Sequence, residues 1–210
     1  MFSAGLAFLA PPVVAGSGNT RTQVLTDNFT GTAGTFPSTN FTNLNGTNGE
    51  IRYDVNNFVN PFGNPADARA IGTFSNDQYF SVVVNGFSAG NVNDIIGGCL
   101  RLGTTTVGGT GVNGYRVKVT DGGVGARTTQ LFKVVNGVET QLGATITSAW
   151  AIGDTIEGEV KGTAIKILRN GAVILSVTDS TFSTGNPGVT ATQAGSGTMR
   201  GDDGFFGNIT

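Results

Sequence analysis

The feature that most constrains the fold of this chain is a run of alternating polar and apolar residues that begins after Gly153. Within residues 155–161 the apolar and small residues fall on one face and the polar residues on the other, which is typical of a strand with one buried side. Residues 163–169 alternate again, and residues 172–178 form a third such run. Asn170-Gly171 lies between the last two and favours a two-residue hairpin, because a type I′ turn needs positive φ at both central positions. We therefore predict an antiparallel β-meander with one solvent-exposed face and one buried face.

Similar signals extend over the rest of the chain. Asn136-Gly137 predicts a second hairpin, between strands at Thr129–Val135 and Val138–Leu142. Surface loops are expected at Gly31–Glu50 and Phe58–Asp67. Further strands are expected at Val24–Phe29, Ile51–Asn56, Ala70–Phe74, Tyr79–Val84, Gly98–Leu102, Tyr115–Thr120, Val189–Gln193 and Gly204–Ile209. Roughly a dozen short strands with no convincing helix predict an all-β sandwich in one domain.

The composition indicates a folded protein of low charge. Charged residues make up 12% of the 210 residues, and the formal net charge is −2. The 12 Lys and Arg residues form no cluster, so we do not expect nucleic-acid binding, which needs concentrated positive charge. Cys99 is the only cysteine, which excludes an internal disulfide, and we expect it to be a small strand residue.

Residues 1–21 form an apolar N-terminal segment, which we separate from a domain at residues 22–210. There is no Lys or Arg before Arg21, and Pro11-Pro12 interrupts the apolar run, which argues against a signal peptide and against a membrane span. We expect the segment to be retained and ordered by packing. It is either an arm that contacts a neighbouring subunit or a first strand that completes the domain. The side chains expected to make this contact are Phe2, Leu6, Phe8 and Leu9.

A set of short motifs resembles the concanavalin A-like lectin/glucanase jelly roll, including its laminin-G-like modules. The motifs are Thr26-Asp27-Asn28-Phe29, Trp150-Ala151-Ile152-Gly153-Asp154, Asn170-Gly171, Asp179, Gly188-Val189 and Asp202-Asp203-Gly204-Phe205-Phe206. The resemblance covers roughly residues 22–209 and implies a jelly-roll sandwich of antiparallel strands. Because this fold serves sugar binding, glycan hydrolysis, adhesion and virion structure alike, it does not choose among these functions.

The inventory of reactive residues argues against an enzyme. The chain has no histidine, which excludes a Ser–His hydrolase and a histidine-containing zinc site. Retaining hydrolases of the resembled superfamily carry E-x-D-x-x-E on one strand, with carboxylates about 5 Å apart, and this chain has no E-x-D. The nearest pair is Glu157 and Glu159, which fall on the polar face of their strand and are expected to be solvated. We predict no catalytic activity and no cofactor.

Calcium is the one ion that the sequence leaves open, because lectins and laminin-G-like modules often bind it through loop oxygens. Asp202 and Asp203 would supply carboxylates, together with Asp27, since the first and last strands pair in the resembled family. The alternative is that these aspartates make turns and cap loops.

Sugar recognition usually depends on exposed Trp or Tyr rings, whereas Phe is mainly core material. With one Trp, three Tyr and 14 Phe, the chain does not favour a strong sugar site. We predict that Tyr53, Tyr79 and Tyr115 make weak contacts to glycan. The alternation at residues 115–120 also places Tyr115 inward and Arg116 and Lys118 outward.

These expectations favour a structural virion protein, such as a bacteriophage capsid decoration, cement or fibre-like protein on the particle surface. Its partners would be the major capsid protein or other virion proteins and further copies of itself, with no nucleic acid and no membrane. The alternative is a carbohydrate-binding, lectin-like module that is secreted or lies at a cell surface.

Overall fold

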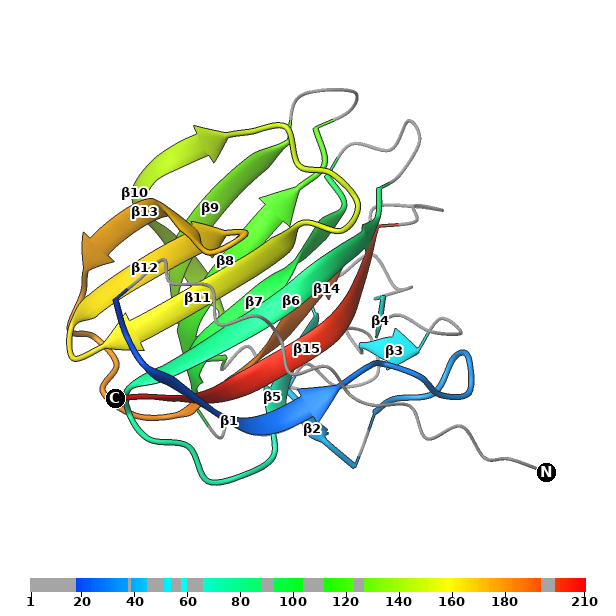
Figure 1. Ribbon diagram of the computed structural model, residues 1–210, viewed down its shortest axis with the longest axis horizontal. Helices are drawn as coiled ribbons and strands as arrows, with labels where there is room; N and C mark the ends of the chain where they lie inside the picture. The colour runs from blue at the N-terminus through cyan, green and yellow to red at the C-terminus, as the bar shows by residue number, and fades with distance from the viewer. Residues whose placement is uncertain are drawn as a thin grey trace.

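The computed structural model describes residues 18–37, 39–44, 51–53, 58–59, 66–87, 93–103, 112–122, 127–193 and 199–210. They form 15 strands, which are numbered in chain order in Figure 1. The strands are β1 (Arg21–Asp27), β2 (Phe41–Asn43), β3 (Arg52–Tyr53), β4 (Phe58–Val59), β5 (Ala66–Ala70), β6 (Gln78–Gly86), β7 (Ile95–Leu102), β8 (Gly114–Thr120), β9 (Thr128–Val135), β10 (Val138–Thr147), β11 (Thr155–Lys161), β12 (Ala164–Arg169), β13 (Ala172–Thr178), β14 (Asn186–Thr192) and β15 (Arg200–Ile209). Within these ranges no helix is long and apolar enough to cross a bilayer.

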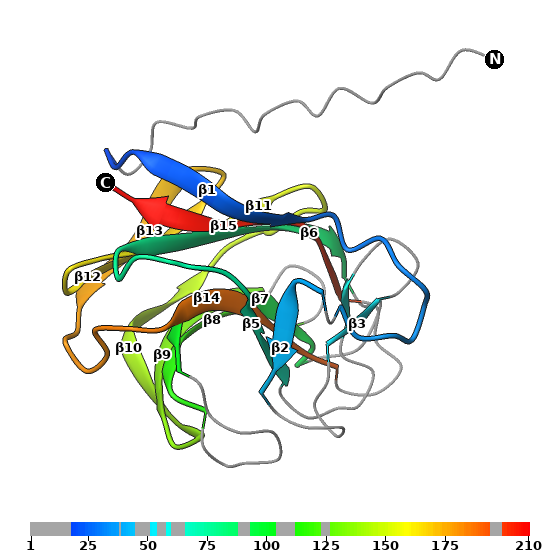
Figure 2. The ribbon, with the colours of Figure 1, turned by 90° about the horizontal axis from the view of Figure 1, so that it is seen from below.

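Two antiparallel sheets pack face to face as a sandwich, and Figure 2 shows them as two layers. The eight-stranded sheet has the order β13-β12-β11-β6-β15-β4-β3, and β1 pairs with β15 beside this path. The seven-stranded sheet has the order β10-β9-β8-β7-β14-β5-β2. The predicted all-β sandwich of antiparallel strands is confirmed.

The core forms where the inward faces of the two sheets meet. Phe80 of β6 is fully buried between two glycines, one from each sheet. A Cβ added at Gly158 of β11 or at Gly98 of β7 would lie 2.3 Å from the Phe80 ring. The two glycines therefore let the large ring fill the space between the layers, at a packing density that leaves no room for even one methyl group.

The meander around Asn170 has the predicted bounds almost residue for residue, and both hairpin asparagines adopt the expected positive φ, 49° at Asn136 and 49° at Asn170. The prediction was wrong in the first third of the chain. The expected loop at 31–50 contains β2, and the loop at 58–67 contains β4 and the start of β5. Strands of two or three residues are too short to show a period in the sequence.

Candidate functional site

The outer face of the seven-stranded sheet carries a row of side chains that the register brings into line. Phe132 on β9 lies opposite Arg116 on β8, and Arg116 lies opposite Cys99 on β7. Cys99 is opposite Gly188 on β14, which in turn is opposite Arg69 on β5. Directly opposite residues of antiparallel strands point to the same side, so these positions share one face. The prediction that Arg116 points outward is confirmed.

At the centre of this row, the guanidinium of Arg116 is shared by two carboxylates. Its Nε donates to Asp67 Oδ1 at 2.9 Å, its Nη2 binds the other oxygen of Asp67, and its Nη1 binds Glu139. Lys118 Nζ also donates to Glu139, at 2.6 Å. The side chains of Arg116 and Asp67 are 5% and 0% exposed. Burial alone would lower the pKa of Arg116, but Asp67 and the other groups around it outweigh burial, and the net direction is upward.

The two carboxylates show that this sheet is curved. Asp67 lies on β5 and Glu139 on β10, five strand steps apart in the sheet order. In a flat sheet the two backbones would be roughly 24 Å apart, at about 4.8 Å per step. Both side chains nevertheless bind the same guanidinium. The sheet therefore curls around Arg116, and its outer face is concave.

An apolar cluster covers the middle of this concave face. Its buried members are Leu44, Cys99, Leu102, Val112 and Val134, and Phe132 packs against them. The Cys99 thiol lies 3.5 Å from Asp67 Oδ1 as a hydrogen-bond donor. Burial, and then the charge of Asp67, raise the pKa of Cys99 well above its ordinary value. Cys99 is therefore a buried, protonated strand residue, as expected.

Beside this cluster, the face remains accessible along β9 and β10. Phe132 is partly buried, and Lys118 Nζ lies 4.6 Å from the centre of its ring. Gln130 Nε2 donates to Gln141 Oε1 at 2.9 Å and to Thr145 Oγ1 at 3.2 Å, and Gln141 Nε2 donates to Thr145 at 3.0 Å. We call Gln130, Phe132, Gln141 and Thr145 the β9–β10 strip. An aromatic ring beside fixed amides and a hydroxyl is a combination that holds polar ligands by stacking and hydrogen bonding.

The outer face of the eight-stranded sheet holds a second buried charge cluster, and it corrects a prediction. Glu157 and Glu159 were expected to be solvated, but they are 4% and 1% exposed. Arg21 of β1 binds Glu157 and donates from Nε to Glu159 Oε1 at 2.7 Å. Asn19 Nδ2 also donates to Glu159, at 2.9 Å. The sequence pattern placed the two glutamates on the correct face. It did not show that Asn19 and Arg21 cover them.

The side chain of Arg21 crosses this face over the ring of Tyr79. The side chain passes from β1 over β15 and β6 to reach β11. On β15 it crosses near Gly207, where an added Cβ would lie 2.7 Å from the Tyr79 ring. The guanidinium carbon then lies 5.0 Å from the centre of that ring. Tyr79 therefore serves as a platform for Arg21, and its ring is only 5% exposed.

The structure does not bring the three predicted sugar-contact tyrosines together. Tyr53 is half-buried on β3, Tyr79 lies under Arg21 on the eight-stranded sheet, and Tyr115 is fully buried in the core. The Tyr115 hydroxyl donates to Asp179 Oδ1 at 2.8 Å and accepts from the Phe182 amide at 3.2 Å. The predicted inward orientation of Tyr115 is confirmed, and only Tyr53 among the three has a substantial accessible surface.

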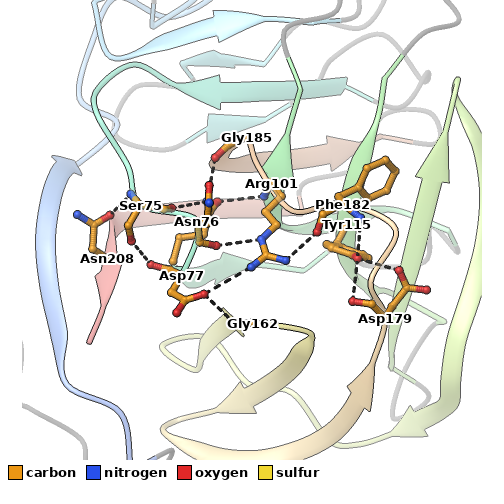
Figure 3. Close-up of polar contacts among 11 residues, drawn as sticks. Ser75, Asn76, Asp77, Arg101, Tyr115, Gly162, Asp179, Phe182, Gly185 and Asn208 are labelled. Atoms are coloured by element: carbon orange, nitrogen blue, oxygen red, sulfur yellow. Dashed lines mark hydrogen bonds and ion pairs between the residues drawn. The ribbon is translucent and has the colours of Figure 1, made fainter.

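Tyr115 belongs to a set of polar contacts at one end of the sandwich, shown in Figure 3. Arg101 Nε donates to the Asn76 carbonyl at 2.9 Å, and its Nη1 donates to the Phe182 carbonyl at 2.7 Å. Arg101 has a φ of 52°, an uncommon value for a residue with a side chain. Together with the Tyr115–Asp179 bond, these contacts fix the connection between β13 and β14 against the turn before β6, and we call them the end clasp. The contacts all join protein groups to one another, so their role is structural.

The residues considered for calcium are used as turn and strand residues. Asp27 Oδ1 accepts from the Phe29 amide at 2.6 Å, and its Oδ2 accepts from Asn40 at 2.9 Å. Asp202 accepts from Asn85 at 3.1 Å, and Asp203 is exposed. Among the described residues, no group of three or more acidic, Cys or His side chains is arranged to hold a metal. The predicted contact residues of the arm, Phe2, Leu6, Phe8 and Leu9, lie outside the described residues.

Comparison with known proteins gives a fold and no closer relation. No family model matches the sequence, and no curated protein is significantly similar to it. The endo-β-1,3-glucanase of Pyrococcus furiosus is similar with a TM-score of 0.63 at 12% identity, over 96% of this chain and 99% of that one. The carbohydrate binding module CBM66 of Bacillus subtilis has a TM-score of 0.54 at 17% identity, over 81% and 94%. A legume lectin-like domain from Entamoeba histolytica has a TM-score of 0.56 at 14% identity, over 82% and 92%.

At such low identity these similarities concern the fold alone. They agree with the observed sandwich of two antiparallel sheets. The chain has the concanavalin A-like lectin/glucanase jelly-roll fold.

Proposed function

We propose that this protein is a non-catalytic carbohydrate-binding module that holds glycan at the β9–β10 strip. The observation that carries the proposal is Phe132, a partly buried ring on the concave face beside the bonded group of Gln130, Gln141 and Thr145. The ring offers an apolar face to a pyranose, and the amides and the hydroxyl offer donors and acceptors to its hydroxyl groups. Such a module acts outside the cell or at a cell surface.

The similar structures support the choice of ligand class. They are a β-1,3-glucanase, a carbohydrate binding module and a lectin-like domain. Neutral β-linked glucans are therefore the first ligands to test. The fold alone does not select them, and the proposal depends on the strip.

The charge cluster beside the strip argues for binding without hydrolysis. A retaining glycosidase needs two carboxylates on either side of the scissile bond. On this face Asp67 and Glu139 are brought together, but the guanidinium of Arg116 lies between them and binds both. A sugar therefore has no access to the space between the carboxylates.

The test is a glycan array followed by calorimetry with the best binder. Phe132→Ala is expected to weaken binding about two- to tenfold, because an aromatic contact is worth roughly 0.5–1.5 kcal/mol beyond its buried area. Lys161→Ala, an exposed position on the other sheet, is the matched control and should bind like the wild type. Absence of glycan binding, or an equal loss in both variants, would contradict the proposal. Release of reducing sugar from a β-glucan would contradict its non-catalytic part.

The virion-protein expectation depends mainly on the contact residues of the N-terminal arm, Phe2, Leu6, Phe8 and Leu9, which lie outside the described residues. It stays a prediction from the sequence, and the reported similarities do not bear on it. Its test is whether deletion of residues 1–20 abolishes attachment to a particle while the domain stays folded.

A further inference from the structure

Arg69 stands apart from the other arginines of the two outer faces. It lies on β5, two residues from Asp67, and shares the concave face with it. Arg21, Arg116 and Arg169 each bind a carboxylate. The Nε of Arg69 is buried, and no hydrogen-bond partner for it occurs in the described part of the chain.

The nearest acidic neighbour on the strand is already engaged. Asp67 uses both of its oxygens for Arg116, and its Oδ1 also faces the Cys99 thiol. Burial lowers the pKa of Arg69, with no opposing anion among its causes, whereas carboxylates hold the pKa of Arg116 above its ordinary value. Arg69 is thus a half-buried cation without the carboxylate that Arg21, Arg116 and Arg169 each have. Removing a charge from water is costly unless it is paired.

The two strands that flank Arg69 present different neighbours to it. Arg69 lies directly opposite Gly188 on the neighbouring strand β14 and directly opposite Thr42 on its other neighbour, β2. On the β14 side, a methyl group of Leu102 lies 2.9 Å from the position of an added Gly188 Cβ, which makes this side an apolar wall. On the other side β2 is the last strand of the sheet and carries the short Thr42 side chain. Since Arg69 is only partly buried, this edge is the side from which an anion would reach it.

We propose that Arg69 is a subsite for an oxyanion, so that the concave face prefers glycans with carboxylate or sulfate groups. A guanidinium binds either group through two parallel hydrogen bonds, and the bound anion would neutralise the cation. The glycan part of this inference rests on the proposed function, but the anion site itself does not. Arg69 is four strand steps from Phe132, so it is a second contact and not part of the β9–β10 strip.

The first experiment follows the Nε–H signals of the arginines by NMR during titration with sodium sulfate, with sodium chloride at equal ionic strength as the reference. We expect a saturable shift of the Arg69 signal with sulfate that chloride does not reproduce. Arg69→Gln should lose saturable sulfate binding at the neighbouring Thr42 and Gly188 amides, and Lys161→Gln, the control cation on the other sheet, should keep it. An unsaturable shift, or equal sulfate binding by Arg69→Gln and the wild type, would overturn the proposal.

The second experiment separates this inference from the proposed function. Neutral β-glucan, oligogalacturonate and sulfated oligosaccharides are compared by calorimetry with the wild type, Arg69→Gln and Phe132→Ala. We expect Arg69→Gln to lose at least fivefold in affinity for the acidic ligands and none for the neutral one. Sulfate binding without any glycan binding would contradict the proposed function and leave the anion site in place. If Arg69→Gln bound the acidic glycans as tightly as the wild type does, the proposed preference for acidic glycans would be overturned.

Discussion

The two outer faces of the sandwich bury the same kind of charge cluster but use it differently. On each face one arginine reaches across neighbouring strands to bind two carboxylates. On the eight-stranded sheet Arg21 comes from the first strand, its side chain is 23% exposed, and its partners are Glu157 and Glu159 of a single strand. On the seven-stranded sheet Arg116 comes from a central strand and is 5% exposed, and its partners lie five strand steps apart.

This difference assigns the two clusters different structural roles. Arg21 joins the start of the described chain to the meander, so its cluster fastens one edge strand. Arg116 ties opposite halves of one sheet to its centre, so its cluster sets the curvature of the face that carries the β9–β10 strip. We therefore expect the loss of Arg116 to affect the whole fold and the loss of Arg21 to act locally.

Arg116→Met is expected to have the largest effect. It leaves the fully buried Asp67 carboxylate without its cation, and loss of one partner of a buried pair typically costs about 3–5 kcal/mol. The free energy of unfolding from urea denaturation measures this loss. The double variant Arg116→Met with Asp67→Leu should recover part of it, because no unpaired charge then remains. A loss below about 1 kcal/mol in the single variant would show that Arg116 does not hold the sheet.

Arg21→Met is expected to have a smaller effect, about 1–3 kcal/mol, because the arginine is more exposed and water can reach the glutamates it leaves behind. Hydrogen exchange should quicken mainly in β1, where the tie to β11 is lost, and the concave face should stay protected. A loss as large as that of Arg116→Met, or faster exchange spread evenly over both sheets, would remove the distinction between the two faces.

The end clasp should give the smallest effect, visible only at extreme pH. Burial raises the pKa of Tyr115 to about 12, and Asp179 adds to the increase. An unfolded tyrosine ionises near pH 10, so stability from this group is complete below about pH 10 and is lost as the pH rises towards 12. Tyr115→Phe should abolish this alkaline dependence of the unfolding midpoint. An unchanged alkaline slope in that variant would show that other groups cause it.

The stability contributed by Asp179 should depend on pH in the opposite sense, and the effect should appear in acid. Burial works to raise the pKa of Asp179, but hydrogen bonds from Thr181, Tyr115 and Lys133 outweigh it and lower the pKa to about 2. An unfolded aspartate titrates near 3.9, so this stability is present above about pH 4 and is lost as the pH falls towards 2. Asp179→Asn should flatten the acid limb of the same midpoint curve, and an unaltered acid limb in that variant would contradict the assignment.

The sequence predicts the fold best where strands are long and their turns are chemically distinct. The meander at 155–178 has both an alternating pattern and an Asn-Gly turn, and its bounds were predicted almost without error. β2 and β4 have neither feature, because they consist of three and two residues. Their place in the sheets is decided by long-range pairing with β5 and β15, which a local pattern does not contain.

The candidate site was largely missed because it depends on contacts between distant strands. The prediction looked for exposed tyrosines, and two of the three are buried. Phe residues were in general expected in the core. In β9, however, Leu131 is the core residue, and the neighbouring Phe132 faces outward. A large aromatic residue on the polar face of an alternating strand was the available signal. The partnership of Asp67 and Glu139 through Arg116 had no signal in the sequence, because 72 positions separate the two (139 − 67).

We propose that the concave face binds glycan at the β9–β10 strip. It is tested by a backbone NMR titration of the wild-type protein with a neutral β-glucan oligosaccharide and, in parallel, with the acidic glycans named above. The account predicts saturable shifts centred on Gln130, Phe132, Gln141 and Thr145, with β11 and β12 of the opposite sheet unaffected. Absence of saturable shifts across the neutral and acidic glycans named above, or shifts centred on the Arg21 face, would contradict it.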